Sequence, residues 1–169
     1  MESRITVRAL RASDLERIVQ LDAQNTGRNR ALWFEGKLKR ALQEADVRVS
    51  LGAESDGRLI GALLGSVQYG EFGLPEPVAV LDTVLVDKNF RGHGVGRAMM
   101  LQMLRNFQGL RIERVRTEVG DQQGELLGFF RSLGFAPSPR LVLELGADAA
   151  LAALRRDERE HEPSGELTT

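Results

Sequence analysis

"DTVLVDKNFRGHGVGRAMMLQMLRNF", residues 82–107, decides the fold, because it joins an apolar run to a helical pattern through a turn rich in glycine. Three alternate positions of this turn are glycine: Gly92, Gly94 and Gly96. The start of a helix presents unpaired backbone N–H groups at the positive end of the helix dipole, and glycine lets an anion approach that backbone closely. A single glycine would satisfy a tight turn. Three of them favour an anion site, for which phosphate is the natural ligand.

Two common phosphate-binding turns do not fit this stretch. The P-loop requires lysine and then serine or threonine after its last glycine, whereas Arg97 and Ala98 follow here. The dinucleotide-binding turn requires G-x-G-x-x-G and an acidic residue further on, which Glu118 could imitate. The spacing here is G-x-G-x-G, and the chain after the turn is too short for the rest of a doubly wound sheet. We therefore disfavour a nicotinamide cofactor.

Composition excludes several classes of partner. The chain of 169 residues has the length of a single domain, and its 23 basic against 24 acidic side chains argue against a nucleic-acid partner. It has no cysteine, and its two histidines, His93 and His161, are far apart, so the sequence predicts neither a disulfide nor a metal site. The charged opening segment and the lack of a long apolar run argue against secretion and against a membrane partner. We therefore predict a cytoplasmic protein.

Periodicity predicts one α/β domain, residues 1–146, followed by a helical or disordered tail, residues 147–169. Alternating apolar residues predict strands over residues 5–7, 47–53, 58–67, 79–86, 115–119 and 141–145, with Asp56 and Gly57 as a hairpin turn. The nearly continuous apolar run at 79–86 is typical of a central strand covered on both faces. Helical patterns follow a capping box of Ser13 and Glu16, and recur over residues 30–45, 97–107 and 124–135. In the third, four residues are expected to face the core: Met100, Met103, Leu104 and Phe107.

The turn and its surroundings resemble a known family. "RGHGVG", residues 91–96, matches the Q/R-x-x-G-x-G/A signature of the GNAT acyltransferases and lies, as in that family, between a strand and an amphipathic helix. "FFRSLGF", residues 129–135, is similar to the "LYEKLGF" end of a late helix in the family. The resemblance covers residues 4–145. It implies a mixed, mostly antiparallel sheet with splayed fourth and fifth strands, flanked by helices, and acetyl-CoA as the cosubstrate.

The resemblance also implies a set of cosubstrate-binding residues. Backbone N–H groups of the turn would bind the pyrophosphate of acetyl-CoA, and Arg91 or Arg97 would add charge; the turn residues are Arg91, Gly92, His93, Gly94, Val95 and Gly96. Backbone groups of Val84 and Val86 in the fourth strand would pair with the pantetheine arm. A backbone N–H near Val84 or Leu85 would polarise the thioester carbonyl as an oxyanion donor.

Two positions depart from the family pattern. Phe130 stands where many members carry a tyrosine that protonates the departing thiolate, and Gln123 stands where an asparagine is expected. The ordinary pKa of a thiol is about 8.5, against about 10.4 for a lysine amine, so the thiolate is a tolerable leaving group without a dedicated acid. Water would supply the proton, with Tyr69, the only tyrosine, as a weaker alternative.

The acceptor amine must lose its proton before it attacks, and two carboxylates are candidate bases. Asp82 lies in the apolar fourth strand, where burial would raise its pKa, although a structural carboxylate that caps a loop or pairs with an arginine is an equal alternative. Glu71 lies between glycines in the loop before that strand, and its alternative is an exposed loop glutamate. Trp33 and Phe34 would line an acceptor pocket, with at least one of them in the core.

The sequence therefore predicts an N-acetyltransferase that transfers the acetyl group of acetyl-CoA to a primary amine. Without cysteine to carry an acyl group, the amine would attack directly in a ternary complex. The acceptor could be a small molecule or a peptide, and a homodimer is compatible with the sequence. A non-catalytic acyl-CoA-binding or interaction module with the same fold is the alternative, motivated by Phe130.

Overall fold

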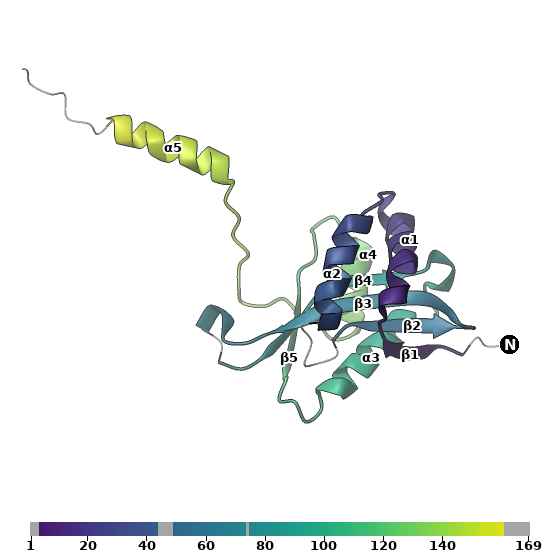
Figure 1. Cartoon of the computed structure of the whole chain (residues 1–169). Helices are drawn as coiled ribbons and strands as arrows, with labels where there is room; N and C mark the ends of the chain where they lie inside the picture. The colour runs from purple at the N-terminus through teal and green to yellow at the C-terminus, as the bar shows by residue number, and fades with distance from the viewer. Residues whose placement is uncertain (1–3, 44–48, 74, 161–169) are drawn as a thin grey trace, which may run out of the picture. The chain divides into compact units, whose positions relative to one another are not determined.

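Five strands form one sheet in the order β1-β2-β3-β4-β5, as the computed structural model of the chain shows (Figure 1). The structure describes residues 4–43, 49–73 and 75–160, in two compact units, Met1–Leu133 and Gly134–Thr169. The strands are β1 Thr6–Ala9, β2 Leu51–Ser55, β3 Arg58–Gln68, β4 Val78–Val86 and β5 Arg114–Thr117. The first four pair antiparallel with their neighbours, and β4 pairs parallel with β5. The predicted mixed, mostly antiparallel sheet is confirmed.

Four helices accompany the sheet in the first unit. They are α1 Leu15–Thr26, α2 Ala31–Gln43, α3 Val95–Phe107 and α4 Gly124–Ser132, with short 3-10 turns η1 Ala12–Asp14, η2 Glu71–Gly73 and η3 Lys88–Phe90. Among the described residues, no helix is long and apolar enough to cross a bilayer. The predicted hairpin is confirmed, because Asp56 and Gly57 join β2 to β3 with φ angles of 49° and 76°. Positive φ at both central residues is the requirement of a type I′ turn.

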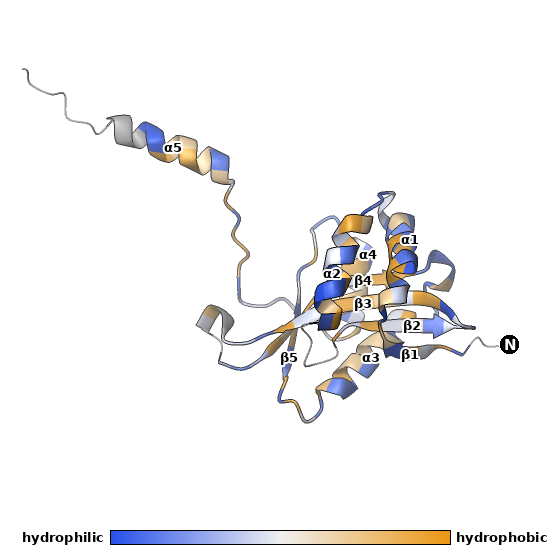
Figure 2. Ribbon diagram, in the orientation of Figure 1, coloured by the Kyte–Doolittle hydropathy of each residue, from blue (hydrophilic) through white to orange (hydrophobic). Residues whose placement is uncertain are grey.

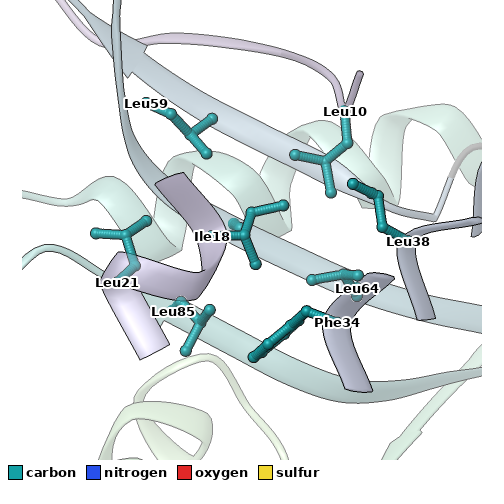
Figure 3. Close-up of a cluster of buried hydrophobic side chains, with 9 residues drawn as sticks. Leu10, Ile18, Leu21, Phe34, Leu38, Leu59, Leu64 and Leu85 are labelled. Carbon is teal, nitrogen blue, oxygen red and sulfur yellow. The ribbon is translucent and has the colours of Figure 1, made fainter. Parts of the chain in front are cut away.

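The two faces of the sheet are covered by different helices. Residues from α1, α2, the sheet and the segment directly after β1 form one buried apolar cluster, drawn in Figure 3: Leu10, Ile18, Leu21, Phe34, Leu38, Leu59, Ala62, Leu64 and Leu85. A Cβ atom on Gly61 of β3 would instead lie 2.8 Å from Val95 and 3.1 Å from Met99 of α3. Since successive residues of a strand point to opposite faces, α3 covers the other face. Figure 2 shows the apolar middle of β3 between these layers.

Several predicted details of the first unit are wrong or only partly right. The predicted capping box of Ser13 and Glu16 is wrong, because the N-cap of α1 is the buried Asp14. The Asp14 carboxylate makes no capping bond to α1; it accepts the Arg11 N–H at 2.7 Å and so closes the preceding turn η1. In α3, Met100, Met103 and Phe107 are buried as predicted, but Leu104 is exposed, because it lies at the edge of the apolar stripe. The helix expected over residues 124–135 ends at Ser132, and β5 ends at Thr117.

The predicted last strand, residues 141–145, is also wrong. These residues are in irregular conformation, although Leu141, Leu143 and Leu145 alternate. Strands form by pairing backbone groups with another strand, and within the second unit the described residues form only helix α5, Ala147–Glu160. Helix α5 confirms the predicted terminal helix, and Figure 2 shows apolar and polar residues mixed along it. The tail expected to be partly disordered spans residues 155–169, and residues 155–160 of it belong to α5. Residues 44–48, which include Val47, and residues 161–169 lie outside the described residues. The predicted domain boundary after residue 146 stays a prediction.

Candidate active site

The glycine turn begins at a buried carboxylate, Asp87, directly after β4. The Asp87 N–H donates to the Ile60 carbonyl at 2.8 Å, and Asp87 Oδ1 accepts the Asn89 N–H at 3.0 Å. Asp87 Oδ2 accepts a hydrogen bond from the guanidinium of Arg17 in α1, and Arg17 also donates to the Leu59 carbonyl at 3.0 Å. A buried charge persists when it is paired and hydrogen-bonded in this way. Asp87 therefore fixes the start of the turn relative to β3 and α1.

The three glycines of the turn serve two different purposes. Gly92 and Gly94 have φ angles of 78° and 79°, and a Cβ atom at either would have no neighbour within 4 Å. Gly96 has helical geometry, and its Cβ would lie 2.9 Å from the Phe129 ring of α4. The first two glycines thus allow a left-handed backbone that faces open space, whereas the third permits close packing of α3 on α4. The assignment of all three glycines to an anion site stays a prediction, and packing against Phe129 gives a structural reason for glycine at the third of them, Gly96.

The N-terminus of α3 has unsatisfied hydrogen-bond donors. Gly94 is the N-cap of α3. Among the described residues, no side chain donates or accepts a capping hydrogen bond at this end, and the first turn of the helix contains no acidic residue. The N–H groups of Val95, Gly96 and Arg97 therefore lack intrahelical acceptors and lie at the positive end of the dipole. A phosphate group fits this arrangement, because it would accept these bonds where the glycines leave room.

Three basic or imidazole side chains surround this N-terminus. Arg91 donates to Asn25 of α1, and its guanidinium lies 3.6 Å from the carboxylate of Glu125 in α4. The exposed His93 ring holds its Nδ1 2.9 Å from the Arg91 carbonyl, and Arg97 donates to the Ser132 carbonyl at 3.3 Å. The predicted turn residues are therefore brought together around one helix end.

Strand β4 has a free backbone edge directly before the turn. Strand β5 pairs with residues 78–81 of β4, and among the described residues no strand pairs with residues 82–86 on that side, which is the splay that the family resemblance implies. Asp87 donates to β3, and the Leu85 carbonyl also faces β3, 3.2 Å from a Cβ position on Gly61. Because strand residues alternate the side to which their backbone groups point, those of Val84 and Val86 face the open edge.

This alternation corrects one predicted site residue. The backbone N–H of Leu85 points to β3 and is used by the sheet, and its side chain is buried in the helix-covered core (Figure 3). Leu85 is therefore not available as an oxyanion donor, whereas the Val84 N–H faces the free edge. Sequence patterns predicted an oxyanion donor near Val84 or Leu85 and did not decide between the two, since the decision depends on the register of β4 against β3.

Asp82 lies at the point where β4 leaves β5. The register of β4 against β3 skips Asp82, because Leu64 pairs with Thr83 and Gly65 with Leu81, so Asp82 is the extra residue of a β-bulge. Its Oδ1 lies 2.5 Å from Lys37 Nζ and accepts a hydrogen bond from Thr83 Oγ1 at 2.9 Å. The side chain is 44% exposed, so the predicted burial of Asp82 is wrong. The bulge and the missing β5 partner turn it toward solvent.

Helix α2 contributes an aromatic ring and a cation beside Asp82. Lys37 Nζ lies 4.5 Å from the centre of the half-exposed Trp33 ring, and Arg30 Cζ lies 4.7 Å from it. Phe34, the neighbouring aromatic residue, is fully buried, which confirms that one of the two rings belongs to the core. Lys37 was not among the candidate site residues predicted from the sequence. Its spacing of four from Trp33 on one helix was the available signal.

The loop before β4 supplies a second group of residues near the β5 side. Phe72 has an unusual φ of 51° and is exposed, and Arg116 of β5 lies with Cζ 5.7 Å from its ring. Arg116 also donates to Gln68 at 2.5 Å. Glu71 lies in η2, and its role as a base stays a prediction. Tyr69, at the end of β3, is exposed.

The two departures from the family pattern lie in α4. Gln123 precedes the helix, and its Oε1 accepts the Gly120 N–H at 3.0 Å. Phe130 is 2% exposed and packs at a tilt against Phe129, with ring centres 5.3 Å apart. Their predicted contact with the cosubstrate stays a prediction. Among the described residues, no group of three or more potential metal ligands is found.

Comparison with known proteins gives the fold and the family. A sequence model described as "Acetyltransferase (GNAT) family" matches residues 11–135. The chain is similar to the aminoglycoside N-acetyltransferase AAC(6')-Iy solved with CoA, at 21% identity and a TM-score of 0.72, over 86% of this chain and 97% of that one. It is similar to the ribosomal-protein-alanine N-acetyltransferase of Brucella melitensis biovar Abortus 2308, at 16% identity and a TM-score of 0.67, over 85% and 99%.

A third similar structure is the glucosamine-6-phosphate N-acetyltransferase of Arabidopsis thaliana, at 16% identity and a TM-score of 0.66, over 84% of this chain and 98% of that one. Among curated proteins, no significant sequence match was found. At these identities the structures establish the shared fold, and the family match rests on the sequence itself.

Proposed function

Because this chain belongs to the acetyltransferase (GNAT) family, we propose that it transfers the acetyl group of acetyl-CoA directly to a primary amine within a ternary complex. Acetyl-CoA is the cosubstrate of this family, and a similar structure contains CoA. The observation that carries the proposal is the uncapped N-terminus of α3 directly after the free edge of β4. One feature would hold the pyrophosphate, and the other would hold the arm that leads to the thioester.

Each part of acetyl-CoA has a counterpart in the chain. The N–H groups of Val95, Gly96 and Arg97 would donate to phosphate oxygens, with the Arg97 and Arg91 guanidiniums adding positive charge. Backbone groups of Val84 and Val86 would extend the ladder of β4 to the amides of the pantetheine arm. The Val84 N–H would donate to the thioester carbonyl oxygen, where negative charge develops as the amine attacks.

The acceptor amine needs a group that removes its proton. Asp82 is the carboxylate at the divergence of β4 and β5, and its exposure lets an amine or a bridging water contact it. The chain has no cysteine, so a cysteine-bound acetyl intermediate is excluded, which supports direct attack of the amine on the thioester. With Phe130 buried where the sequence resemblance led us to expect a tyrosine, the departing thiolate would take its proton from solvent or from the attacking nitrogen.

The names of the three similar structures support a primary amine as the acceptor group, since all three are N-acetyltransferases. Their names give acceptors of very different size: an aminoglycoside, an alanine of a ribosomal protein and glucosamine 6-phosphate. The acceptor screen should therefore contain an aminoglycoside, a peptide with N-terminal alanine, an amino-sugar phosphate, a lysine peptide and a polyamine. Fold alone does not choose among them.

Two measurements test the proposal. Calorimetric titration with acetyl-CoA should give saturable binding in the micromolar range or tighter, and the amine panel should then release CoA. Initial rates at varied concentrations of both substrates should give intersecting double-reciprocal lines, since a ternary complex forms before chemistry. Parallel lines would contradict direct attack. Binding without CoA release for any amine would support the non-catalytic module instead.

A further inference from the structure

Lys37 presents a primary amine at the position that an acceptor amine must reach. Its Nζ lies 2.5 Å from Asp82 Oδ1, at the residue where β4 leaves β5. The same nitrogen lies 4.5 Å from the centre of the Trp33 ring, and the Lys37 side chain is only 13% exposed. A carboxylate beside an aromatic face is the usual recognition set for an ammonium group. The protein's own lysine occupies that set.

We propose that Lys37 is an intramolecular acetyl acceptor, so that the protein acetylates itself at this residue. The inference rests on the proposed function, because the acetyl group comes from the acetyl-CoA that the same site would bind. Val84, which would hold the thioester carbonyl, lies two residues along β4 from Asp82. This separation is roughly 7 Å at the strand rise of about 3.3 Å per residue. Rotation about the flexible four-carbon stem of Lys37 covers much of that distance.

The transfer balances without any further reactant. The Lys37 ammonium gives one proton to the Asp82 carboxylate, and the neutral nitrogen then forms a bond to the acetyl carbon. The carbon–sulfur bond breaks, and its electron pair leaves on the sulfur of CoA. The sulfur takes the second proton from the nitrogen, and Asp82 returns its proton to water. The products are acetyl-Lys37, CoA and one proton.

Acetylation would change the site in which it occurs. An acetylated lysine carries no charge, so Lys37 would lose both the ion pair with Asp82 and the cation–π contact with Trp33. The carboxylate and the exposed ring face would then be available to an external amine. The unmodified lysine competes for both groups.

The chain offers an internal control for this reaction. The sequence contains three lysines, Lys37, Lys39 and Lys88. Lys39 lies on the same helix and is exposed, whereas the Lys37 side chain is mostly buried. Spontaneous acetylation by acetyl-CoA in solution favours the exposed amine, so it would modify Lys39 first. Transfer within the site would modify Lys37 first.

The test is peptide mapping by mass spectrometry after the full-length protein is incubated with acetyl-CoA. Acetylation of Lys37 should exceed that of Lys39 in rate by roughly tenfold or more, because the reacting groups are held together. The first-order rate constant, that is, the fraction of Lys37 modified per unit time, should be independent of protein concentration. It should fall when excess CoA competes with acetyl-CoA. Lys37→Arg should abolish the modification, Lys39→Arg should leave it unchanged, and Asp82→Asn should slow it.

Three results would overturn the inference. Preferential modification of Lys39 would show that transfer does not occur within the site. A first-order rate constant at Lys37 that rises with protein concentration would show that transfer is not intramolecular. An unmodified Lys37 in a protein that binds acetyl-CoA and acetylates an added amine would overturn this inference and leave the proposed function intact. Failure to bind acetyl-CoA in the calorimeter would overturn both.

Discussion

Substitution of Gly94 by alanine should separate the cost to folding from the cost to cosubstrate binding. Gly94 has a φ of 79°, and a Cβ atom there would meet nothing within 4 Å. The folding cost is therefore the left-handed backbone alone, about 1–2 kcal/mol for a residue with a side chain. The new methyl group would stand where a phosphate approaches the N–H groups of α3. Losing one charge-assisted hydrogen bond, worth about 1.5–3 kcal/mol, raises the Kd for acetyl-CoA roughly 10- to 100-fold.

Gly57 provides the matched control, because it has a φ of 76°, no neighbour within 4 Å of its Cβ position, and a place in the β2–β3 hairpin. Gly57→Ala should lower the free energy of unfolding in urea by the same amount as Gly94→Ala. Calorimetry should then find the Kd of Gly57→Ala unchanged. Equal affinities for acetyl-CoA in the two variants, with equal losses of stability, would refute the assignment of the turn to phosphate.

Three further predictions concern carboxylates. Asp87→Asn should lower the free energy of unfolding in urea by about 3 kcal/mol, since it leaves Arg17 without its buried counter-ion; a change below about 1 kcal/mol would contradict this. Burial disfavours ionisation of Asp14, but hydrogen bonds from the Arg8 guanidinium and the Arg11 N–H, with the positive charge of both arginines, together outweigh burial and lower the pKa of Asp14 below its ordinary value of 3.8. The stabilisation that ionised Asp14 contributes should be complete above about pH 4 and should be lost as the pH falls toward the folded-state pKa. Thermal unfolding should show this loss as a fall in Tm of the unmodified protein at acidic pH, and the fall should be smaller in Asp14→Asn. If Asp82 is the base, Asp82→Asn should lower kcat about 100-fold or more with the Kd for acetyl-CoA unchanged, whereas Glu71→Gln should not; the reverse result would transfer the role to Glu71.

The parts of this protein that sequence patterns predicted correctly are those decided by neighbouring residues. The hairpin follows from Asp56 and Gly57, because these two residue types tolerate positive φ. The start of α3 follows from the glycine turn, since Gly94 has a positive φ and is the N-cap of the helix that begins within the same stretch. No distant contact was needed for either.

Predictions failed where a distant part of the chain decides the outcome. Asp82 appeared buried because its neighbours are apolar, but its exposure depends on a bulge against β3 and on where β5 stops pairing. Its partner Lys37 belongs to a helix far away in the sequence, and basic residues on a helix usually face solvent. The alternating residues 141–145 have the pattern of a strand, but a pattern cannot supply the partner that a strand requires.

The free edge of β4 also has a consequence for hydrogen exchange. An N–H group that faces solvent exchanges its hydrogen quickly, whereas one bonded within a sheet exchanges only when the sheet opens. The amides of Val84 and Val86 should therefore exchange fast in the free protein, while that of Leu85, between them, is slow. Acetyl-CoA should remove this alternation by slowing both valines. Read residue by residue, the exchange pattern of one strand would thus report whether the sheet is complete only when its substrate is bound.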